Sequence, residues 1–250
     1  VIKGGSSIGA GIMLGGLGLT ACSQESDAAT RLKLGFAAVA KSTADIVTVP
    51  VGYTAKPLVS WGDPLFAGGT LPVNIYDLTP AQQEAALGDH HDGMCYFGLS
   101  ATGLPDRSNS QRGLLAINHE AITEDFAHVK GPTYANLDSA GKLQSLDAAA
   151  TPPKLDSART SSDECLKEMA LHGITVVEIE KAGTGYRYVQ GSSFNRRITP
   201  YTPVVLSGPA RGDDLVKTRY DNAGQNARGT LNNCAYGFTP WGTYLTCEEN

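Results

Sequence analysis

A thiol and two carboxylates stand close together near the end of the sequence, on either side of a Thr-Pro-Trp-Gly turn. Cys234 follows the amides Asn232 and Asn233, and Glu248 is adjacent to Glu249. Such a mixture of soft and hard ligands can hold metal ions. If the two glutamates lie on a strand, their side chains point to opposite faces, so only one of them reaches a given site. The alternative is a small buried thiol beside a solvated strand end.

A second set of polar residues closes a predicted apolar strand at Gly113–Ile117. It consists of Asn118, His119 and Glu120. Glu120 and the amide oxygen of Asn118 are hard ligands suited to calcium, and His119 could donate a hydrogen bond or bind iron. Sites are commonly built where a strand ends. A triplet that only caps the turn is the alternative.

The run Asp89-His90-His91-Asp92 is dense in ligand types. Two adjacent histidines cannot both face one way on a strand, so a clamp of two histidines on one metal is not expected. The favoured interpretation is that one histidine or Asp92 orients the turn by hydrogen bonding. A direct ligand role stays open as the alternative.

Three basic residues are candidate contacts to a substrate phosphate: Arg196, Arg197 and Lys217. Arginine suits phosphate because it can donate two parallel hydrogen bonds. Ordinary surface charge is the alternative. Lys167 and His172, on a predicted helix, are expected to be structural. The sequence contains no Walker motif, nucleophile elbow or HExxH.

Composition describes a soluble, β-rich globular protein. The 250 residues carry a net charge of −5, which argues against a general nucleic-acid binder. The 29 glycines and 13 prolines punctuate short apolar runs, a pattern that favours strands. No fixed-period repeat is visible, but a propeller with degenerate blades is compatible with the sequence. The five cysteines are irregularly spaced and include no CxxC, so neither a disulfide framework nor a structural zinc site is expected.

The pattern of apolar, glycine and proline residues predicts the local elements. Short strands are expected between residues 31 and 75, and a short helix or turn is expected to begin at Thr79–Glu84. A surface insertion is expected at about 131–162, followed by a helix at 162–173 that Ser162 or Asp163 caps and Gly173 stops. A hairpin of 174–180 with 186–190 and a polar connection at 213–229 follow.

Residues 1–22 are predicted to be an export signal. An uncharged apolar run at Ile8–Leu19 leads into Leu19-Thr20-Ala21-Cys22, which reads as a lipobox with Cys22 as the lipidated residue. A plain cleaved signal peptide is the alternative. Val1-Ile2-Lys3 fits the tail of a twin-arginine signal, with the arginine pair expected upstream. Residues 23–30 are expected to be a polar tether, and the whole chain is expected to be the front part of a longer protein.

Several ordered motifs together resemble one family. They are His91-Asp-Gly-Met94, Gly113-Leu-Leu-Ala-Ile-Asn-His-Glu120, Glu168-Met-Ala-Leu-His-Gly173, Phe194-Asn-Arg-Arg-Ile-Thr199, Leu206-Ser-Gly-Pro209, and the terminal run from Gly229 to Asn250. In this order they resemble the PhoX-type alkaline phosphatases, from about residue 89 to residue 250. Tyr236 departs from the family pattern, which usually has a small residue there.

The resemblance implies a mostly β fold, a β-propeller expected to have six blades in the full parent. Residues 31–250 would be its incomplete N-terminal part, with short helices and long loops. The family binds Ca²⁺ and iron, here Fe³⁺, and hydrolyses phosphate monoesters outside the cytoplasm after twin-arginine export. The protein is therefore expected in the bacterial periplasm or at the cell surface, as a monomer, with lipidated Cys22 attaching it to the membrane and with no nucleic-acid partner.

Carried over position by position, Cys234 resembles the family's iron-binding cysteine. Glu248 and Glu249 resemble its metal-binding carboxylates, with Glu249 the first choice, and Glu120 resembles a residue of the same cluster. Cys234, Glu249 and Glu120 are the predicted catalytic set, and Asn118 is a further predicted ligand. Two alternatives stay open: another calcium-dependent propeller hydrolase (phosphodiesterase, phytase or lactonase), and a non-catalytic surface lipoprotein. The 250 residues alone are expected to be inactive.

Overall fold

The computed structural model describes residues 35–72, 74–134, 137–141 and 159–249. The chain divides into two compact units, one ending at Ala55 and one beginning at Lys56. The described part of the first unit contains no helix or strand, and its Phe36 and Tyr53 rings meet edge to face with centroids 5.4 Å apart. The predicted signal at 1–22, with Cys22, and the tether at 23–30 lie outside the described residues. Every helix and strand described below belongs to the second unit.

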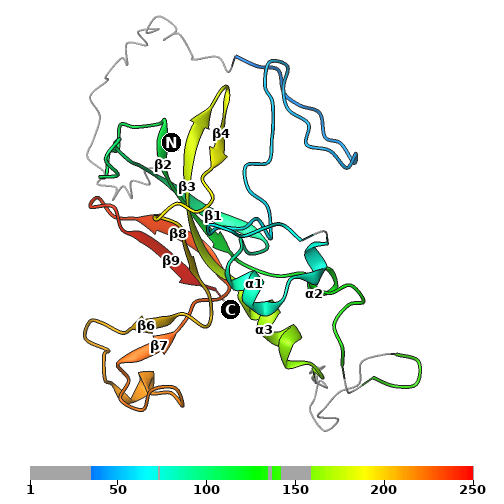
Figure 1. Cartoon of the computed structure of the whole chain (residues 1–250), viewed down its shortest axis with the longest axis vertical. Helices are drawn as coiled ribbons and strands as arrows, with labels where there is room; N and C mark the ends of the chain where they lie inside the picture. The colour runs from blue at the N-terminus through cyan, green and yellow to red at the C-terminus, as the bar shows by residue number, and fades with distance from the viewer. Residues whose placement is uncertain (1–34, 73, 135–136, 142–158, 250) are drawn as a thin grey trace, which may run out of the picture. The chain divides into compact units, whose positions relative to one another are not determined.

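The centre of the second unit is a five-stranded antiparallel sheet (Figure 1). Its strands are β1 (His91–Gly98), β2 (Arg112–His119), β3 (Gly173–Ala182), β4 (Gly185–Tyr188) and β5 (Arg196–Ile198). The first four follow one another across the sheet, and β5 also pairs with β3. The predicted hairpin is confirmed, because β3 and β4 pair up to Ala182 opposite Gly185.

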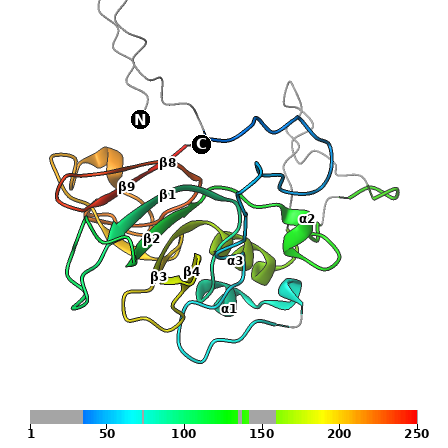
Figure 2. The same ribbon diagram turned by 90° about the horizontal axis from the view of Figure 1, so that it is seen from above.

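Two small two-stranded sheets are the other sheets among the described residues. One pairs β6 (Pro203–Val205) with β7 (Asn226–Arg228), and the other pairs β8 (Asn233–Phe238) with β9 (Tyr244–Glu248). Figure 2 shows the β8–β9 hairpin alongside β1 and β2. The predicted polar connection at 213–229 is wrong in part, because it contains β7 and a 3₁₀ turn, η2 (Asp214–Val216).

The short strands expected between residues 31 and 75 are not formed in the described part of that range, residues 35–72 and 74–75. Within the described part of that range, Pro64 makes an isolated bridge to Ala86, and η1 (Ile75–Asp77) is a 3₁₀ turn. From Pro50 onward, prolines and glycines interrupt the segment every few residues. Proline lacks the N–H that a ladder needs, and glycine raises the entropic cost of extending the chain, so the apolar runs do not pair.

The hydrophobic core lies against the central sheet. Leu65 and Leu87 reach it from the preceding loops, and Ile117, Val177 and Ile179 reach it from β2 and β3. These five side chains are at most 5% exposed. Full burial of each contributes about 1.5–3 kcal/mol, so the core fixes the register of the strands that lead to the site.

In the part of the chain that the structure describes, three short helices flank the sheet: α1 (Pro80–Glu84), α2 (Glu124–Ala127) and α3 (Ser162–Leu171). The predicted cap of α1 is confirmed, with Thr79 and Gln82 bonded reciprocally. The cap of α3 is Ser161, one residue before the predicted Ser162, because Ser161 has the extended backbone and its hydroxyl accepts the Glu164 N–H. Among the described residues, no helix is long and apolar enough to cross a membrane.

The predicted stop of α3, Gly173, has another role as well. It opens β3 at φ +102°, and a Cβ there would lie 2.0 Å from the carbonyl oxygen of Ile198. The insertion expected at 131–162 is described at its two ends, where the Thr160 N–H donates to the Thr133 carbonyl at 3.2 Å. Its last residue already belongs to α3, and residues 135–136 and 142–158 lie outside the described residues.

Candidate metal centre

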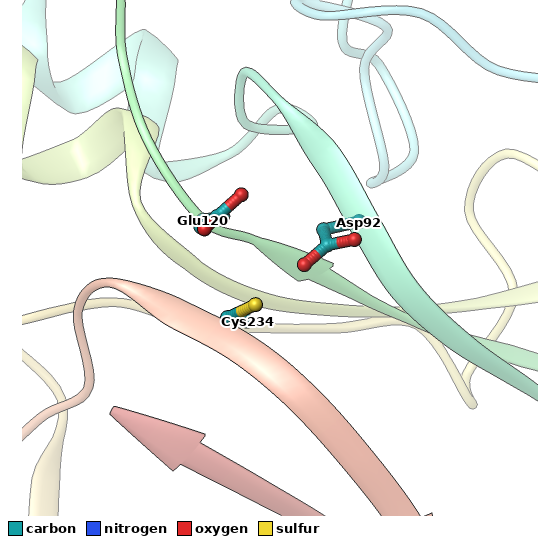
Figure 3. Close-up of side chains that lie close together, drawn as sticks. All are labelled: Asp92, Glu120 and Cys234. Atoms are coloured by element: carbon teal, nitrogen blue, oxygen red, sulfur yellow. The ribbon is translucent and has the colours of Figure 1, made fainter. Parts of the chain in front are cut away.

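Three side chains with metal-binding atoms meet between β1, β2 and β8. They are Asp92, Glu120 and Cys234, whose ligand atoms all lie within 4.8 Å of one another (Figure 3). Asp92 is exposed, and the other two are half-buried. Two carboxylates and a thiol that converge at the surface are a donor set that a metal ion can use.

A bulge in β1 aims Asp92 at this point. His91 pairs with His119 and Met94 pairs with Ile117, so Asp92 and Gly93 together oppose Asn118. Two residues opposite one re-aim the side chains of a strand. The extra residue places Asp92 on the side of the sheet that faces β8.

A second bulge lies at Cys234 itself. Asn233 pairs with Glu248 and Tyr236 with Thr246, so Cys234 and Ala235 together oppose Cys247. Bulges are frequent next to functional sites for the same geometric reason. Two of the three cluster residues therefore come from irregular points of their strands.

The close approach of β8 to β1 depends on Gly93. A Cβ at this position would lie 2.7 Å from the Cys234 carbonyl oxygen and 2.8 Å from the Tyr236 ring. Distances this short are not tolerated between real atoms, so any larger residue would push β8 outward. The backbone that carries the thiol passes directly over a residue without a side chain.

Asn118 is fully buried and is not free to bind a metal. Its amide nitrogen donates to the Cys234 carbonyl at 2.9 Å and to the Ala235 carbonyl at 3.3 Å. Its amide oxygen lies 2.9 Å from the Tyr244 hydroxyl and accepts from the Thr246 hydroxyl at 3.0 Å. Both lone-pair directions of that oxygen are engaged, so the predicted ligand role of Asn118 is wrong.

The surrounding carboxylates control the thiol. The Asp92 carboxylate, followed by burial and by the carboxylates of Glu249 and Glu120, raises the pKa of the Cys234 thiol to about 12. Without a cation the thiol therefore keeps its proton at neutral pH. A bound cation reverses this preference, because it stabilises the thiolate and both carboxylates together.

The paired glutamates have different surroundings. Glu248 accepts the Thr230 hydroxyl at 2.7 Å and the Leu231 N–H at 3.1 Å, which ties β9 to the turn before β8. Glu249 is exposed, and its carboxylate is near enough to Cys234 to act on the thiol. It is outside the three-residue cluster. Its ligand role, like that of Glu248, stays a prediction.

The histidines near the cluster serve the fold. His119 is fully buried, with Nδ1 3.0 Å from the Asp89 carbonyl and Nε2 2.7 Å from the Thr175 hydroxyl. The Gly88 N–H also donates to Nε2 at 3.3 Å, so the proton of the neutral ring belongs on Nδ1. Burial, reinforced by the Arg197 charge, holds the pKa of His119 well below its usual range. The suggested iron-binding role of His119 is wrong, because both ring nitrogens are used.

The preceding histidines bond to their own loop. The His91 Nε2 lies 3.2 Å from the Gly88 carbonyl, and the His90 Nδ1 lies 3.1 Å from the Asp89 carboxylate. The two histidines therefore orient the turn by hydrogen bonding, as the favoured interpretation of the sequence expected for a histidine or Asp92. The open alternative, a direct ligand role, fits the position of Asp92. The sequence shows its ligand chemistry but not the bulge that aims it.

Arg197 is not a phosphate contact, because its guanidinium is used inside the fold. Its five N–H groups donate to five backbone carbonyls: Ala86 (3.0 Å), Ile174 (3.2 Å), Ile198 (2.9 Å), Ala170 (2.7 Å) and His172 (2.7 Å). No donor is left for a substrate, so that prediction is wrong.

The other predicted anion contacts lie outside the cluster. Arg196 is exposed on β5, and the Lys217 ammonium pairs with Asp214 at 2.5 Å after η2. A phosphate role for either residue stays a prediction. Lys167 and His172 have structural contacts, as expected: Lys167 donates to the Tyr76 carbonyl at 2.6 Å, and the His172 Nδ1 lies 3.0 Å from the Glu120 carbonyl.

Comparison with known proteins gives one consistent result. A family model described as alkaline phosphatase PhoX matches residues 34–250. The solved structure of Pseudomonas fluorescens PhoX in complex with vanadate, a transition state analogue, is 35% identical, with a TM-score of 0.69. That match covers 86% of this chain and 32% of the other, so this chain spans about a third of its length. No match was found among curated protein sequences. The similarity to this propeller-like structure confirms the predicted fold class, part of a mostly β propeller.

Proposed function

This chain belongs to the PhoX family of alkaline phosphatases, and we propose that the protein hydrolyses phosphate monoesters with the help of bound metal ions. The observation that carries the proposal is the convergence of Asp92, Glu120 and Cys234 within 4.8 Å. The related Pseudomonas protein was solved with vanadate as a transition state analogue, which is the chemistry expected of phosphoryl transfer. The alternative of a non-catalytic lipoprotein has no comparable support.

The donor set suggests which metals the site would hold. A thiolate prefers a transition metal, and we assign Cys234 to Fe³⁺. Carboxylates prefer hard cations, and we assign Ca²⁺ to Asp92 and Glu120, with Glu249 as a further ligand. Metal ions bound in this way would polarise phosphoryl oxygens and activate water at neutral or alkaline pH.

The chain's own residues would prepare the site in two ways. Cys234 must give up its proton when a metal binds, since the thiolate is the ligand form. Asp92 and Glu120 hold that proton on the thiol until a cation arrives, because their charges oppose a second anion beside them. Metal affinity is therefore expected to rise with pH, which suits an enzyme that works in alkaline conditions.

We also propose that the protein acts outside the cytoplasm, in the periplasm or at the cell surface. The support is the sequence of residues 1–22, with its apolar run, its lipobox at Cys22 and its resemblance to a twin-arginine signal. Incorporation of radiolabelled fatty acid into the wild type and not into Cys22→Ala tests the lipid anchor. Equal labelling of the two proteins would show that Cys22 does not carry the lipid.

Substrate choice tests the proposed activity directly. The full-length protein, loaded with calcium and iron, is assayed with p-nitrophenyl phosphate at alkaline pH, and then with bis-p-nitrophenyl phosphate and a simple lactone. We expect monoester hydrolysis that a chelator abolishes and added metal restores. Preference for the diester or the lactone would instead favour one of the other propeller hydrolases. Absence of all three activities in a folded, metal-loaded protein would favour the binding-module interpretation.

A further inference from the structure

We propose that Asn118 is a positioning residue that fixes Cys234 against Asp92 and Glu120, so that its side chain sets the metal affinity of the thiol. The inference rests on the proposed function, because it assumes that the cluster binds metal. In this role Asn118 acts on the metal through the position of Cys234 and is not a metal ligand itself.

The first argument is the place of Asn118 in the sheet. Asn118 lies on β2, directly opposite the bulge that Asp92 and Gly93 form on β1. The next residue of β2, His119, faces the other side of the sheet. The Asn118 side chain contacts Cys234 and Ala235 of β8, and Glu120, just beyond the end of β2, has its carboxylate within 4.8 Å of the Cys234 thiol. Asn118 is therefore the residue of the central sheet best placed to hold the thiol-bearing strand.

The second argument is what Asn118 holds. Its amide nitrogen donates to two successive carbonyls, those of Cys234 and Ala235, at 2.9 Å and 3.3 Å. These residues form the bulge of β8, where the regular ladder with β9 is interrupted. A carbonyl at a bulge is left without its ladder partner. Asn118 supplies a partner at that point and ties the backbone of Cys234 to β2.

The third argument is a chain of hydrogen bonds that orients the Asn118 amide. The Asn233 amide nitrogen donates to the Thr246 hydroxyl at 3.0 Å, and that hydroxyl donates to the Asn118 amide oxygen at 3.0 Å. Because the Thr246 oxygen receives one proton and gives its own, the direction of the chain is determined. The Asn118 oxygen must then face Thr246, and its nitrogen must face Cys234.

The Tyr244 hydroxyl strengthens the same arrangement. It lies 2.9 Å from the Asn118 amide oxygen and 3.1 Å from the Gly93 carbonyl, so β9 contacts both strands that carry carboxylates. Asn118 thus stands at a junction of β1, β2, β8 and β9, and it is fully buried there. Loss of its side chain would free the Cys234 backbone to move relative to Asp92 and Glu120.

The experiment measures metal affinity and does not depend on phosphatase activity. Full-length protein, freed of metal, is titrated with Co²⁺ alone, and the thiolate-to-cobalt charge-transfer absorption is recorded. Outer residues that orient a ligand typically change metal affinity by 10–100-fold. We expect Asn118→Leu, which keeps the number and branching of the side-chain heavy atoms and removes both hydrogen-bonding ends, to weaken Co²⁺ binding by about 10-fold or more.

Asn195→Leu is the matched control. Asn195 is also buried, and its amide nitrogen also donates to two backbone carbonyls, those of Leu65 and Val189, at 2.8 Å and 2.9 Å. It is outside the cluster. We expect Asn195→Leu to lower the melting temperature without changing the affinity for Co²⁺. Equal weakening by both variants would overturn the positioning role, because it would show a general effect of stability.

A gentler pair covers the case in which Asn118→Leu does not fold. Thr246→Val removes the hydroxyl that orients the Asn118 amide, and Thr246→Ser keeps it. We expect weaker Co²⁺ binding in Thr246→Val and restored binding in Thr246→Ser. Unchanged affinity in Thr246→Val, with a charge-transfer band in the wild type, would overturn the role of Asn118 alone. A wild type without any charge-transfer band would overturn the proposed metal site and this inference with it.

Discussion

Gly93 lets two distant parts of the chain meet at the scale of single residues. Its missing side chain leaves room for the Cys234 carbonyl and the Tyr236 ring, which would lie 2.7 Å and 2.8 Å from a Cβ. The thiol and the Asp92 carboxylate therefore approach each other because of a residue that contributes no ligand. Cys234 and Glu120 could be proposed from the sequence, since their chemistry and the family resemblance both indicate them. The role of Gly93 could not, because it depends on a contact between residues 141 positions apart.

We expect Gly93→Ala to damage the site while leaving most of the fold intact. The added methyl group must displace β8, and a misplacement of about 1 Å can lower kcat/KM by about 100-fold. Gly237→Ala is the control, since a Cβ at Gly237, also on β8, meets nothing within 4 Å. Steady-state rates on p-nitrophenyl phosphate, with melting temperatures alongside, make the comparison. Equal rates for the two variants would show that the close approach at Gly93 has no functional importance.

Bulges and a buried guanidinium organise the site at the scale of elements. The bulges of β1 and β8 aim Asp92 and Cys234, and Arg197 joins β5 to β3 and to the end of α3. The apolar run at Gly113–Ile117 and the hairpin of 174–180 with 186–190 predicted β2, β3 and β4, but the bulges depend on the pairing register, which one strand's sequence does not reveal. Arg197 was misassigned for a similar reason. Its type suits phosphate equally well, and only the packed carbonyls around it decide its role.

We expect Arg197→Lys to lower the free energy of unfolding by about 3 kcal/mol. Lysine offers three donors in place of five, so carbonyls that end α3 and line β3 lose their partners, and hydrogen bonds to a charged group contribute about 1.5–3 kcal/mol each. Arg196→Lys serves as the control, because Arg196 is exposed on the same strand. It should change the free energy of unfolding by less than about 0.5 kcal/mol. Urea denaturation in the presence of chelator separates the two. A similar small loss in both variants would contradict the structural role of Arg197.

We expect the central sheet to lose stability in acid partly through Glu178 of β3. Burial alone would raise its pKa, but hydrogen bonds from Arg112, at 2.5 Å, and from Ser192 lower it overall. A carboxyl whose pKa is lower in the folded state stabilises the fold above its unfolded pKa, about 4.3, and loses this contribution as pH falls through the folded value. Unfolding free energies between pH 6 and pH 3 should therefore fall less steeply in Glu178→Gln than in the wild type. Parallel pH profiles would argue against this role.

Family membership and the residue cluster support one account at the scale of the whole molecule. The family match spans residues 34–250, and the cluster joins residues 92, 120 and 234, which the antiparallel sheet and the β8–β9 hairpin bring together. The sequence motifs were sufficient to predict the fold class and the family. They were not sufficient to separate metal ligands from the residues that position those ligands. Asn118 and Glu120 stand two positions apart in one motif and both carry a side-chain oxygen that could bind a cation. Only the partners of each side chain distinguish them.

The most direct test of the central claim is the iron content of the purified full-length protein, measured for the wild type and for Cys234→Ser by mass spectrometry of the metals. Serine keeps nearly the same volume and removes the thiolate, so a change reports on the ligand and not on packing. We predict bound iron in the wild type and its loss in Cys234→Ser, with the melting temperature in chelator unchanged. Equal iron in both proteins would contradict the assignment of Cys234 as a metal ligand.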